Sequence, residues 1–197
     1  EILRCLVGSE MCIRDRGSKK SFWTAKTMAV GAMCMALSSV LSLIKLWPMP
    51  MGGSVTPASM LPLLLFAYCY GVGPGMVLGA LYGVMQFLLD GMAWAALGAI
   101  PNLLDYPIAF GLLGLAGCFR GSKAKMTAGF VLGCFGRFMA SFLSGFIFYG
   151  QYAPEGVNPV WYSLTYNGSY MLVECIICIA LGLLVGERLA KELKKVA

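Results

Sequence analysis

Residues 141–174 read SFLSGFIFYGQYAPEGVNPVWYSLTYNGSYMLVE: an apolar segment ending in aromatic residues, a loop rich in proline, glycine and asparagine, and a second apolar segment. The second segment opens with hydrogen-bonding side chains, among them Tyr162, Tyr166 and Asn167. Polar groups inside a bilayer need partners within the protein or in a wet cavity, so these side chains are unsuited to a lipid-facing surface. The stretch therefore predicts two membrane-spanning helices that form one wall of a ligand site.

The composition of the whole chain is that of an integral membrane protein. Of its 197 residues, 59% are hydrophobic and only 12% are charged. A soluble domain of this size carries far more charge on its surface. Because a helix of about 20 residues crosses a bilayer, the chain accommodates about six spans. The fold class we predict is an all-α integral membrane bundle of about six transmembrane helices in one domain.

The apolar runs and the basic clusters between them predict the topology. We expect spans over residues 24–46, 60–70, 76–89, 102–119, 126–149 and 162–185. Basic residues cluster before the first span, at 120–125, and after the last span. Because cytoplasmic loops carry the excess of Lys and Arg, we expect a multi-pass protein of the cell membrane with cytoplasmic N- and C-termini. The net charge of +6 thus reflects topology and does not indicate nucleic-acid binding.

The first 16 residues, EILRCLVGSEMCIRDR, differ from everything that follows. They are charged, lack a sustained apolar run and do not form a secretory signal. They resemble a translated sequencing-adapter scar. We therefore expect residues 1–16 to be non-native and a single six-helix membrane domain to occupy residues 17–197.

Three loops are predicted to meet outside the membrane: 47–59, the connection before Asp105, and 151–161. The first, WPMPMGGSVTPAS, contains prolines and a Gly-Gly-Ser sequence that end the helix and leave backbone N–H groups unpaired. Such a loop closes over a small molecule or forms an ordinary turn, and its sequence alone favours neither. Asp105 lies near the expected start of the fourth span, where the helix dipole favours an anion.

Small and charged residues inside the spans predict specific contacts. In the first span, alanines recur every four residues, including Ala32 and Ala36, and such a stripe allows another helix to approach closely. The approaching helix belongs to this chain or to a partner. Arg137 and Glu174 lie in mid-span, where a lone charge is costly. We expect Arg137 to pair with Glu174 or Asp105; the alternative is that it extends to the membrane surface.

The chain lacks the residue sets of an enzyme. It has no histidine, which excludes Ser/His and Cys/His nucleophile pairs, and no Walker-type loop ending in Gly-Lys-Ser/Thr. Its eight cysteines show no metal-ligand spacing, and we expect no metal or cofactor. What remains is carboxylates and aromatic rings, the combination that binds a flat cationic organic ligand. The aromatic residues in question are Trp47, Trp94, Tyr106, Tyr149, Trp161, Tyr162 and Tyr166. An interfacial aromatic belt accounts for several of these rings, although not for Asp105 or Asn167.

Four motifs in order connect the chain to a known family. MPMGGSVTPASMLP (49–62), LLDYPIAFGLLGLAG (103–117), GRFMASFLSGFIFYGQYAP (136–154) and WYSLTYNGSYMLVE (161–174) resemble the thiamine-specific S component of energy-coupling factor (ECF) transporters. The resemblance extends over nearly all of residues 19–187. It implies a six-helix subunit that captures thiamine from outside. It also implies that a transmembrane coupling subunit and two ATPase subunits are partners, with ATP hydrolysis in the latter.

The resemblance also assigns roles to individual residues. The substrate-binding positions that it implies are Asp105, Tyr106, Ser141, Gly145, Tyr149, Tyr162 and Asn167, with a lid loop at Gly52, Gly53 and Ser54. Ala32 and Ala36 match the small-residue motif that contacts the coupling subunit. Two positions depart from the family pattern, since Ser141 occupies the place of a usual histidine and Tyr149 that of a usual tryptophan.

These departures leave the exact ligand open. Serine forms hydrogen bonds but does not stack, so a contact worth about 1–2 kcal/mol is absent. The chain is therefore a weaker thiamine binder, or its ligand is a thiamine precursor, an analogue or another vitamin. Functions of another class are a stand-alone secondary transporter, for which inverted repeats are expected, or a small membrane enzyme.

Overall fold

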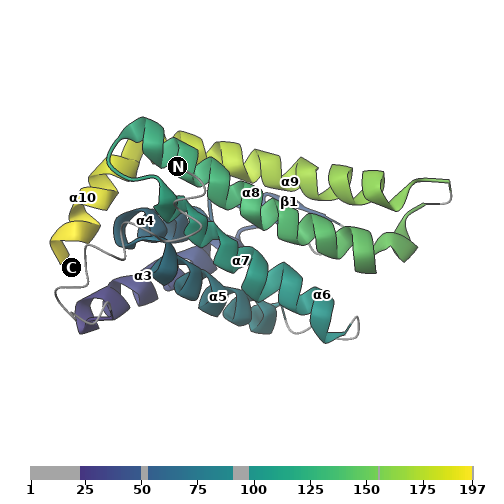
Figure 1. Ribbon diagram of the computed structural model, residues 1–197, viewed down its shortest axis with the longest axis horizontal. Coiled ribbons are helices and arrows are strands. Elements are labelled where there is room, and N and C mark those ends of the chain that lie inside the picture. Colours follow the sequence, from purple (N-terminus) through teal and green to yellow (C-terminus); the bar gives the residue numbers. More distant parts are fainter. Residues whose placement is uncertain (1–22, 50–52, 91–97, 155, 197) are drawn as a thin grey trace.

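The protein is a bundle of helices with one small hairpin (Figure 1). The computed structural model describes residues 23–49, 53–90, 98–154 and 156–196, so the predicted non-native segment 1–16 lies outside it. The elements are α3 (Ala25–Leu43), β1 (Trp47–Pro48), β2 (Ser54–Val55), α4 (Leu61–Tyr70), α5 (Val72–Leu89), α6 (Ala99–Leu103), the π-helical η2 (Leu104–Ile108), α7 (Ala109–Leu112), the 3-10 helix η3 (Leu113–Cys118), α8 (Lys123–Phe148), the 3-10 helix η4 (Gly150–Tyr152), α9 (Pro159–Leu181), the π-helical η5 (Gly182–Gly186) and α10 (Glu187–Val196).

The predicted fold class is confirmed. Five helical stretches of the described residues are long and apolar enough to cross a membrane: 25–43, 72–89, 99–118, 123–148 and 159–193. The sixth apolar helix, α4, is shorter. These bounds lie within four residues of the predicted spans, because the apolar runs that require burial also set the helix lengths, except that the last stretch continues to residue 193 where the prediction ended at 185.

Helix α4 lies at the centre of the bundle. All side chains from Leu61 to Cys69 are buried, against α3, α5, η3, α8 and α10. Leu64 and Phe66 have no exposed surface. Arg120 donates hydrogen bonds to the carbonyl groups of Tyr68, at 3.0 Å, and Cys69. A cation at a helix C-terminus satisfies unpaired carbonyl oxygens and complements the helix dipole, so the Arg120 side chain stabilises the C-terminal end of α4.

The glycine repeat of α5 allows the chain from η2 to η3 to pack directly on that helix. A Cβ atom at Gly79 would collide with the carbonyl group of Phe110, and one at Gly83 with that of Tyr106. This is the close backbone contact that small residues allow between helices. Its consequence is that the backbone around Asp105 is held tightly against α5.

Helices α8 and α9 form a long antiparallel pair (Figure 1). Asn158 caps α9, since its side chain accepts a hydrogen bond from the Val160 N–H at 2.9 Å, and Pro159 occupies the first helical position. The Ser163 hydroxyl donates to the Phe142 carbonyl at 2.8 Å and joins the two helices. Residues 141–174 therefore form two helices that pack against each other and are joined by a loop, as expected.

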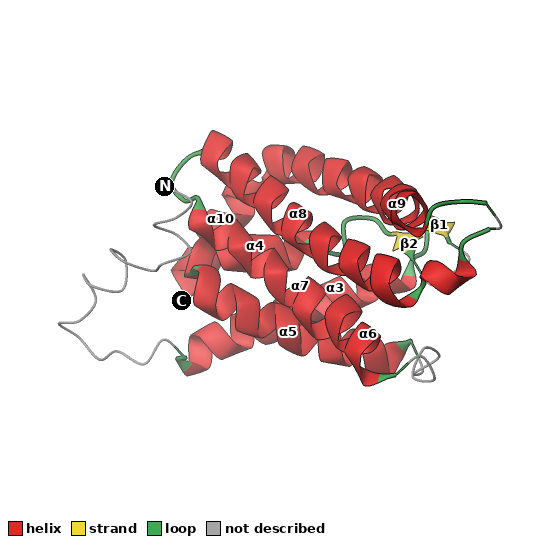
Figure 2. Cartoon of the chain, turned by 45° about the vertical axis from the view of Figure 1, so that its right-hand side comes forward, coloured by secondary structure: helices red, strands yellow, loops and turns green. Residues whose placement is uncertain are grey.

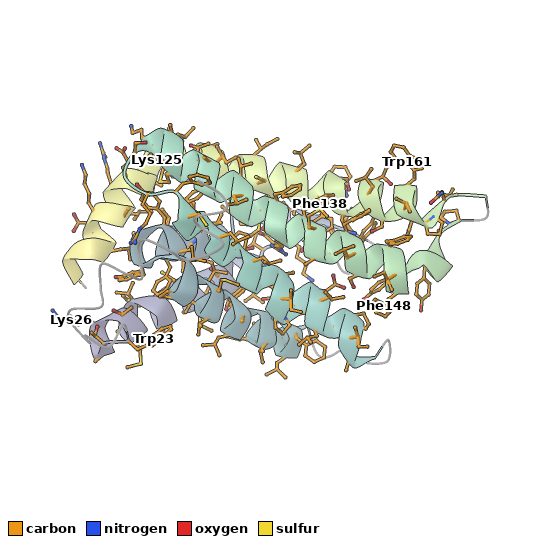
Figure 3. All side chains as sticks on the ribbon, viewed as in Figure 1. Trp23, Lys26, Lys125, Phe138, Phe148 and Trp161 are labelled. Carbon is orange, nitrogen blue, oxygen red and sulfur yellow. The ribbon has the colours of Figure 1, made fainter. Side chains whose placement is uncertain are left out.

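The two ends of the bundle differ. Figure 2 shows β1, β2 and α6 at the end opposite to α10 and the C-terminus, and the α8–α9 connection lies at the same end as α6 (Figure 1). The described parts of the three loops predicted to meet therefore lie at one end of the bundle. Lys26 and Lys125 lie at the α10 end (Figure 3). There α10 is anchored across the bundle, because Tyr70 donates a hydrogen bond to the Leu193 carbonyl at 2.9 Å.

The alanine stripe of α3 faces outward. Thr27, Val30, Gly31 and Cys34 form the buried side of this helix, whereas the alanines at 25, 29, 32 and 36 are exposed. Among the described residues, no other helix of this chain covers the stripe. Intramolecular packing is therefore the wrong explanation for its spacing.

Candidate functional site

A cavity lies between α8, α9, the hairpin loop and the segment around Asp105. It is lined by every predicted substrate-binding residue that the structure describes: Gly53, Ser54, Asp105, Tyr106, Ser141, Gly145, Tyr149, Tyr162 and Asn167. Gly52, the remaining predicted position, lies outside the described residues. Four segments that are far apart in sequence thus place their polar side chains around one space.

Asp105 reaches the cavity from a widened helical turn. The fourth span begins at Ala99, so the expectation that Asp105 lies near a helix start is wrong. Pro107 has no N–H to donate and opens the helix into the π turn η2. The carboxylate is stabilised by a hydroxyl group, since Asp105 Oδ2 accepts a hydrogen bond from Ser144 at 2.7 Å. Ser141 lines the same cavity.

Tyr106 is hydrogen-bonded to a second carboxylate of the site, Asp90, which was not predicted as a site residue from the sequence. Its hydroxyl donates to Asp90 Oδ2 at 2.9 Å, and its ring meets Phe87 edge to face with centroids 5.3 Å apart. Asp90 also lines the cavity. The predicted site residue Tyr106 is therefore held in place by a neighbouring acid at the end of α5.

Asn167 is buried, and its amide is engaged at both ends. Nδ2 donates to the Ser163 carbonyl at 3.1 Å and the Ser141 carbonyl at 3.4 Å, while Oδ1 accepts from Tyr170 at 3.1 Å. A Cβ atom at Gly145 would collide with the Ser163 hydroxyl. Gly145 thus allows α9 to approach α8, and Asn167 joins the two helices at the cavity wall.

The deep end of the cavity holds the predicted ion pair. Arg137 Nη1 lies 3.7 Å from Glu174 Oε2, and the guanidinium carbon lies 4.1 Å from the centre of the Phe110 ring. Glu174 also accepts hydrogen bonds from Thr56 and from Ser59, the latter at 2.9 Å. The pairing of Arg137 with Glu174 is confirmed, and extension of Arg137 to the membrane surface is wrong. The sequence predicted this pair, but it did not show that both residues line the cavity.

The hairpin loop packs against α9 and covers part of the cavity. The Gly53 N–H donates to the Tyr166 hydroxyl at 3.3 Å, and the Met49 N–H donates to the Gly53 carbonyl at 2.7 Å. A Cβ atom at Gly53 would lie 2.8 Å from a ring carbon of Tyr170. Because Gly53 and Ser54 line the cavity, this geometry favours a covering loop over an ordinary turn.

Tyrosines form most of the aromatic lining. The aromatic residues that line the cavity are Tyr82, Tyr106, Phe110, Tyr149, Tyr162, Tyr166 and Tyr170. Trp47 and Trp161 are 67% and 63% exposed and do not line the cavity, which corrects their expected role. Trp94 lies outside the described residues. An interfacial belt explains these exposed tryptophans.

The charged lining residues give the cavity an excess of negative charge. Asp90, Asp105 and Glu174 are opposed by Lys45 and Arg137, a formal excess of one negative charge. Because Glu174 is paired with Arg137, the excess lies on the Asp90 and Asp105 side. Tyrosine faces beside a carboxylate attract an aromatic cation, and the arrangement suits a ligand with a single positive charge.

Comparison with known proteins agrees with this chemistry. Residues 28–193 match the sequence profile of the family described as Thiamine transporter protein (Thia_YuaJ). The chain is 38% identical over 144 residues to the thiamine transporter ThiT of Bacillus subtilis, covering 66% of this chain and 73% of that protein. It is 31% identical over 170 residues to ThiT of Lacticaseibacillus paracasei, covering 78% and 81%.

A solved structure shows the same fold. ThiT from Listeria monocytogenes superposes with a TM-score of 0.73 at 20% sequence identity, and the match covers 85% of this chain and 96% of that one. At this identity the likeness supports the fold alone. The family profile over residues 28–193 and the two bacterial relatives show that the chain belongs to the thiamine transporter family, whose members are membrane transport components and not enzymes.

Proposed function

We propose that this protein is the substrate-binding subunit of an ECF-type, ATP-driven uptake transporter and that its cavity binds thiamine captured from outside the cell. The observation that carries the proposal is the position of Asp105, a partly buried carboxylate that lines a cavity together with several tyrosine rings. Thiamine consists of a positively charged thiazolium ring joined to a neutral aminopyrimidine. The carboxylate compensates the positive charge, and the tyrosine faces stack on the two flat rings.

The direct test is calorimetric titration of the detergent-purified protein with thiamine. We expect saturable one-site binding with a Kd below about 1 µM, equivalent to a binding free energy more favourable than about −8 kcal/mol. The pyrimidine and thiazole halves serve as controls, each at a concentration high enough to detect millimolar binding. If the protein binds neither thiamine nor either of its halves, the proposal is wrong.

A related ligand is the second candidate, because Ser141 occupies the usual histidine position. In the structure Ser141 lines the cavity and has no ring to stack on a ligand. A thiamine precursor or analogue that depends less on stacking at this position would then bind more tightly than thiamine. The same titration separates these ligands, since a response to one half without a response to thiamine identifies a precursor.

The outward face of α3 supports a partner surface. Ala32 and Ala36 are exposed, and their small side chains allow another helix to approach closely. The basic α10 end, with Lys26 and Lys125, is the end we assign to the cytoplasm, and the cavity end opens outside (Figure 3). The transmembrane coupling subunit would bind α3, and two cytoplasmic ATPase subunits would drive release of the vitamin.

Replacing Ala32 by tryptophan separates binding from transport. We expect Ala32→Trp to leave thiamine affinity within about twofold, because α3 is exposed at this position, and to abolish uptake by blocking close helix contact. The measurements are calorimetry on the purified variant and uptake of labelled thiamine by cells that supply the partner subunits. Leu172→Trp is the matched control, since Leu172 is 64% exposed on α9. Full uptake by Ala32→Trp would exclude α3 from the partner interface.

A further inference from the structure

Ser144 is a fully buried serine whose hydroxyl is directed at the predicted ligand-binding carboxylate. It has 0% exposed surface and does not line the cavity. Its hydroxyl donates to Asp105 Oδ2 at 2.7 Å, a bond that joins α8 to the π turn η2. Neither the four sequence motifs nor the family resemblance assigned any role to Ser144.

The direction of this hydroxyl is unusual for a serine within a helix. Such hydroxyls commonly return to a carbonyl of their own helix, as Ser39 does to Met35 at 2.8 Å and Ser169 does to Tyr166 at 2.8 Å. Ser144 instead bonds to a different segment, 39 residues away in sequence. The Ser144 hydroxyl therefore donates its hydrogen bond to a predicted site residue instead of a backbone carbonyl of α8.

Ser144 and Ser141 lie close together on α8 but differ in their position relative to the cavity. They are three residues apart on α8 and so lie on one face of the helix. Ser141 lines the cavity, whereas Ser144 lies behind Asp105, away from the ligand space. With Oδ2 bound on the buried side, the carboxylate presents its remaining acceptor capacity to the cavity.

Asp105 is bonded to Ser144, whereas the nearby basic residue is paired with another acid. Arg137 contacts Glu174, which is also bound by Thr56 and Ser59. Among the described residues, Ser144 is the hydrogen-bond partner found for Asp105. Hydrogen bonds donated to a carboxylate stabilise its ionised form and fix its orientation.

We propose that Ser144 is a positioning residue that holds Asp105 as an oriented anion, so that the cavity distinguishes a positively charged ligand from a neutral ligand of the same shape. The inference rests on the proposed function, since it concerns how the same cavity recognises the charge of thiamine.

The test compares thiamine with its neutral thiophene analogue, in which carbon replaces the charged ring nitrogen. Calorimetry gives both dissociation constants for the wild type and for Ser144→Ala. We expect the variant to bind thiamine about tenfold more weakly, the loss of one hydrogen bond to a charged group, and to bind the neutral analogue within about twofold. Charge discrimination, the ratio of the two constants, falls about tenfold.

Two further variants control for packing. Ser38→Ala is the matched control, because Ser38 also has 0% exposed surface and its hydroxyl has no hydrogen-bond partner among the described residues. It should leave both constants unchanged. Ser144→Thr keeps a hydroxyl and should restore most of the discrimination.

The outcomes separate this inference from the proposed function. Equal losses for both ligands in Ser144→Ala would make Ser144 a packing residue and overturn the inference, as would unchanged binding of both. A wild-type protein that binds neither ligand would remove the proposed function, and the inference with it. Wild-type binding with a selective loss for thiamine supports both.

Discussion

Asp105→Asn is expected to weaken thiamine binding about a hundredfold. Asparagine preserves the size of the side chain but removes its charge, and with it the negative excess of the cavity lining. Loss of one member of a buried charge pair costs about 2–5 kcal/mol, and each 1.4 kcal/mol corresponds to tenfold in affinity. Calorimetric titration of the purified variant with thiamine measures the effect.

The neutral thiophene analogue provides the control for Asp105→Asn. Its affinity should change little, because it carries no positive charge for the carboxylate to compensate. Unchanged thiamine affinity in this variant would place the charge-compensating group elsewhere. Asp90 would then be the next carboxylate to replace, since it lines the same cavity and accepts the Tyr106 hydrogen bond.

Glu174→Ala should produce the largest loss of stability, about 3–5 kcal/mol in the free energy of unfolding. Glu174 is 1% exposed and is the ion-pair partner of Arg137. Its removal leaves a buried guanidinium without a counter-charge and deprives Thr56 and Ser59 of their acceptor. Thermal unfolding in detergent, followed by circular dichroism, should show a clearly lower midpoint than the wild type.

A double variant tests whether the loss arises from the unpaired charge. Replacing both Arg137 and Glu174 by methionine removes the pair together, which is often close to neutral for stability. We expect this variant to recover most of the midpoint lost in Glu174→Ala. If the double variant unfolds as early as the single one, cavity formation and lost packing explain the effect instead of charge.

The helical spans were predictable because each one has its own local pattern of apolar residues in the sequence. An apolar run of the right length has to lie in the membrane, and the proline, glycine and asparagine residues between 153 and 159 have to end it. The pairing of Arg137 with Glu174 was predictable for a similar reason. Two opposite charges in adjacent spans are both costly unless they meet.

The details of the site depended on packing that no local pattern records. Asp105, Tyr106 and Pro107 resemble the start of a helix, yet the helix begins at Ala99, because α5 holds this segment through Gly79 and Gly83. The tryptophans were expected in the cavity because they are aromatic. Which rings point inward is decided by how the helices rotate against one another, and here Tyr82, Phe110 and Tyr170 do so.

The shortness of α4 determines how far into the membrane the cavity reaches. Its 10 residues rise about 15 Å, half of the roughly 30 Å hydrocarbon thickness. Thr56 and Ser59, which bind Glu174 at the deep end of the cavity, directly precede this helix. A molecule bound there would lie about half a bilayer thickness from the other end of α4, whose side chains from Leu61 to Cys69 are buried. We therefore propose that delivery to the other side requires the subunit to move around its cargo.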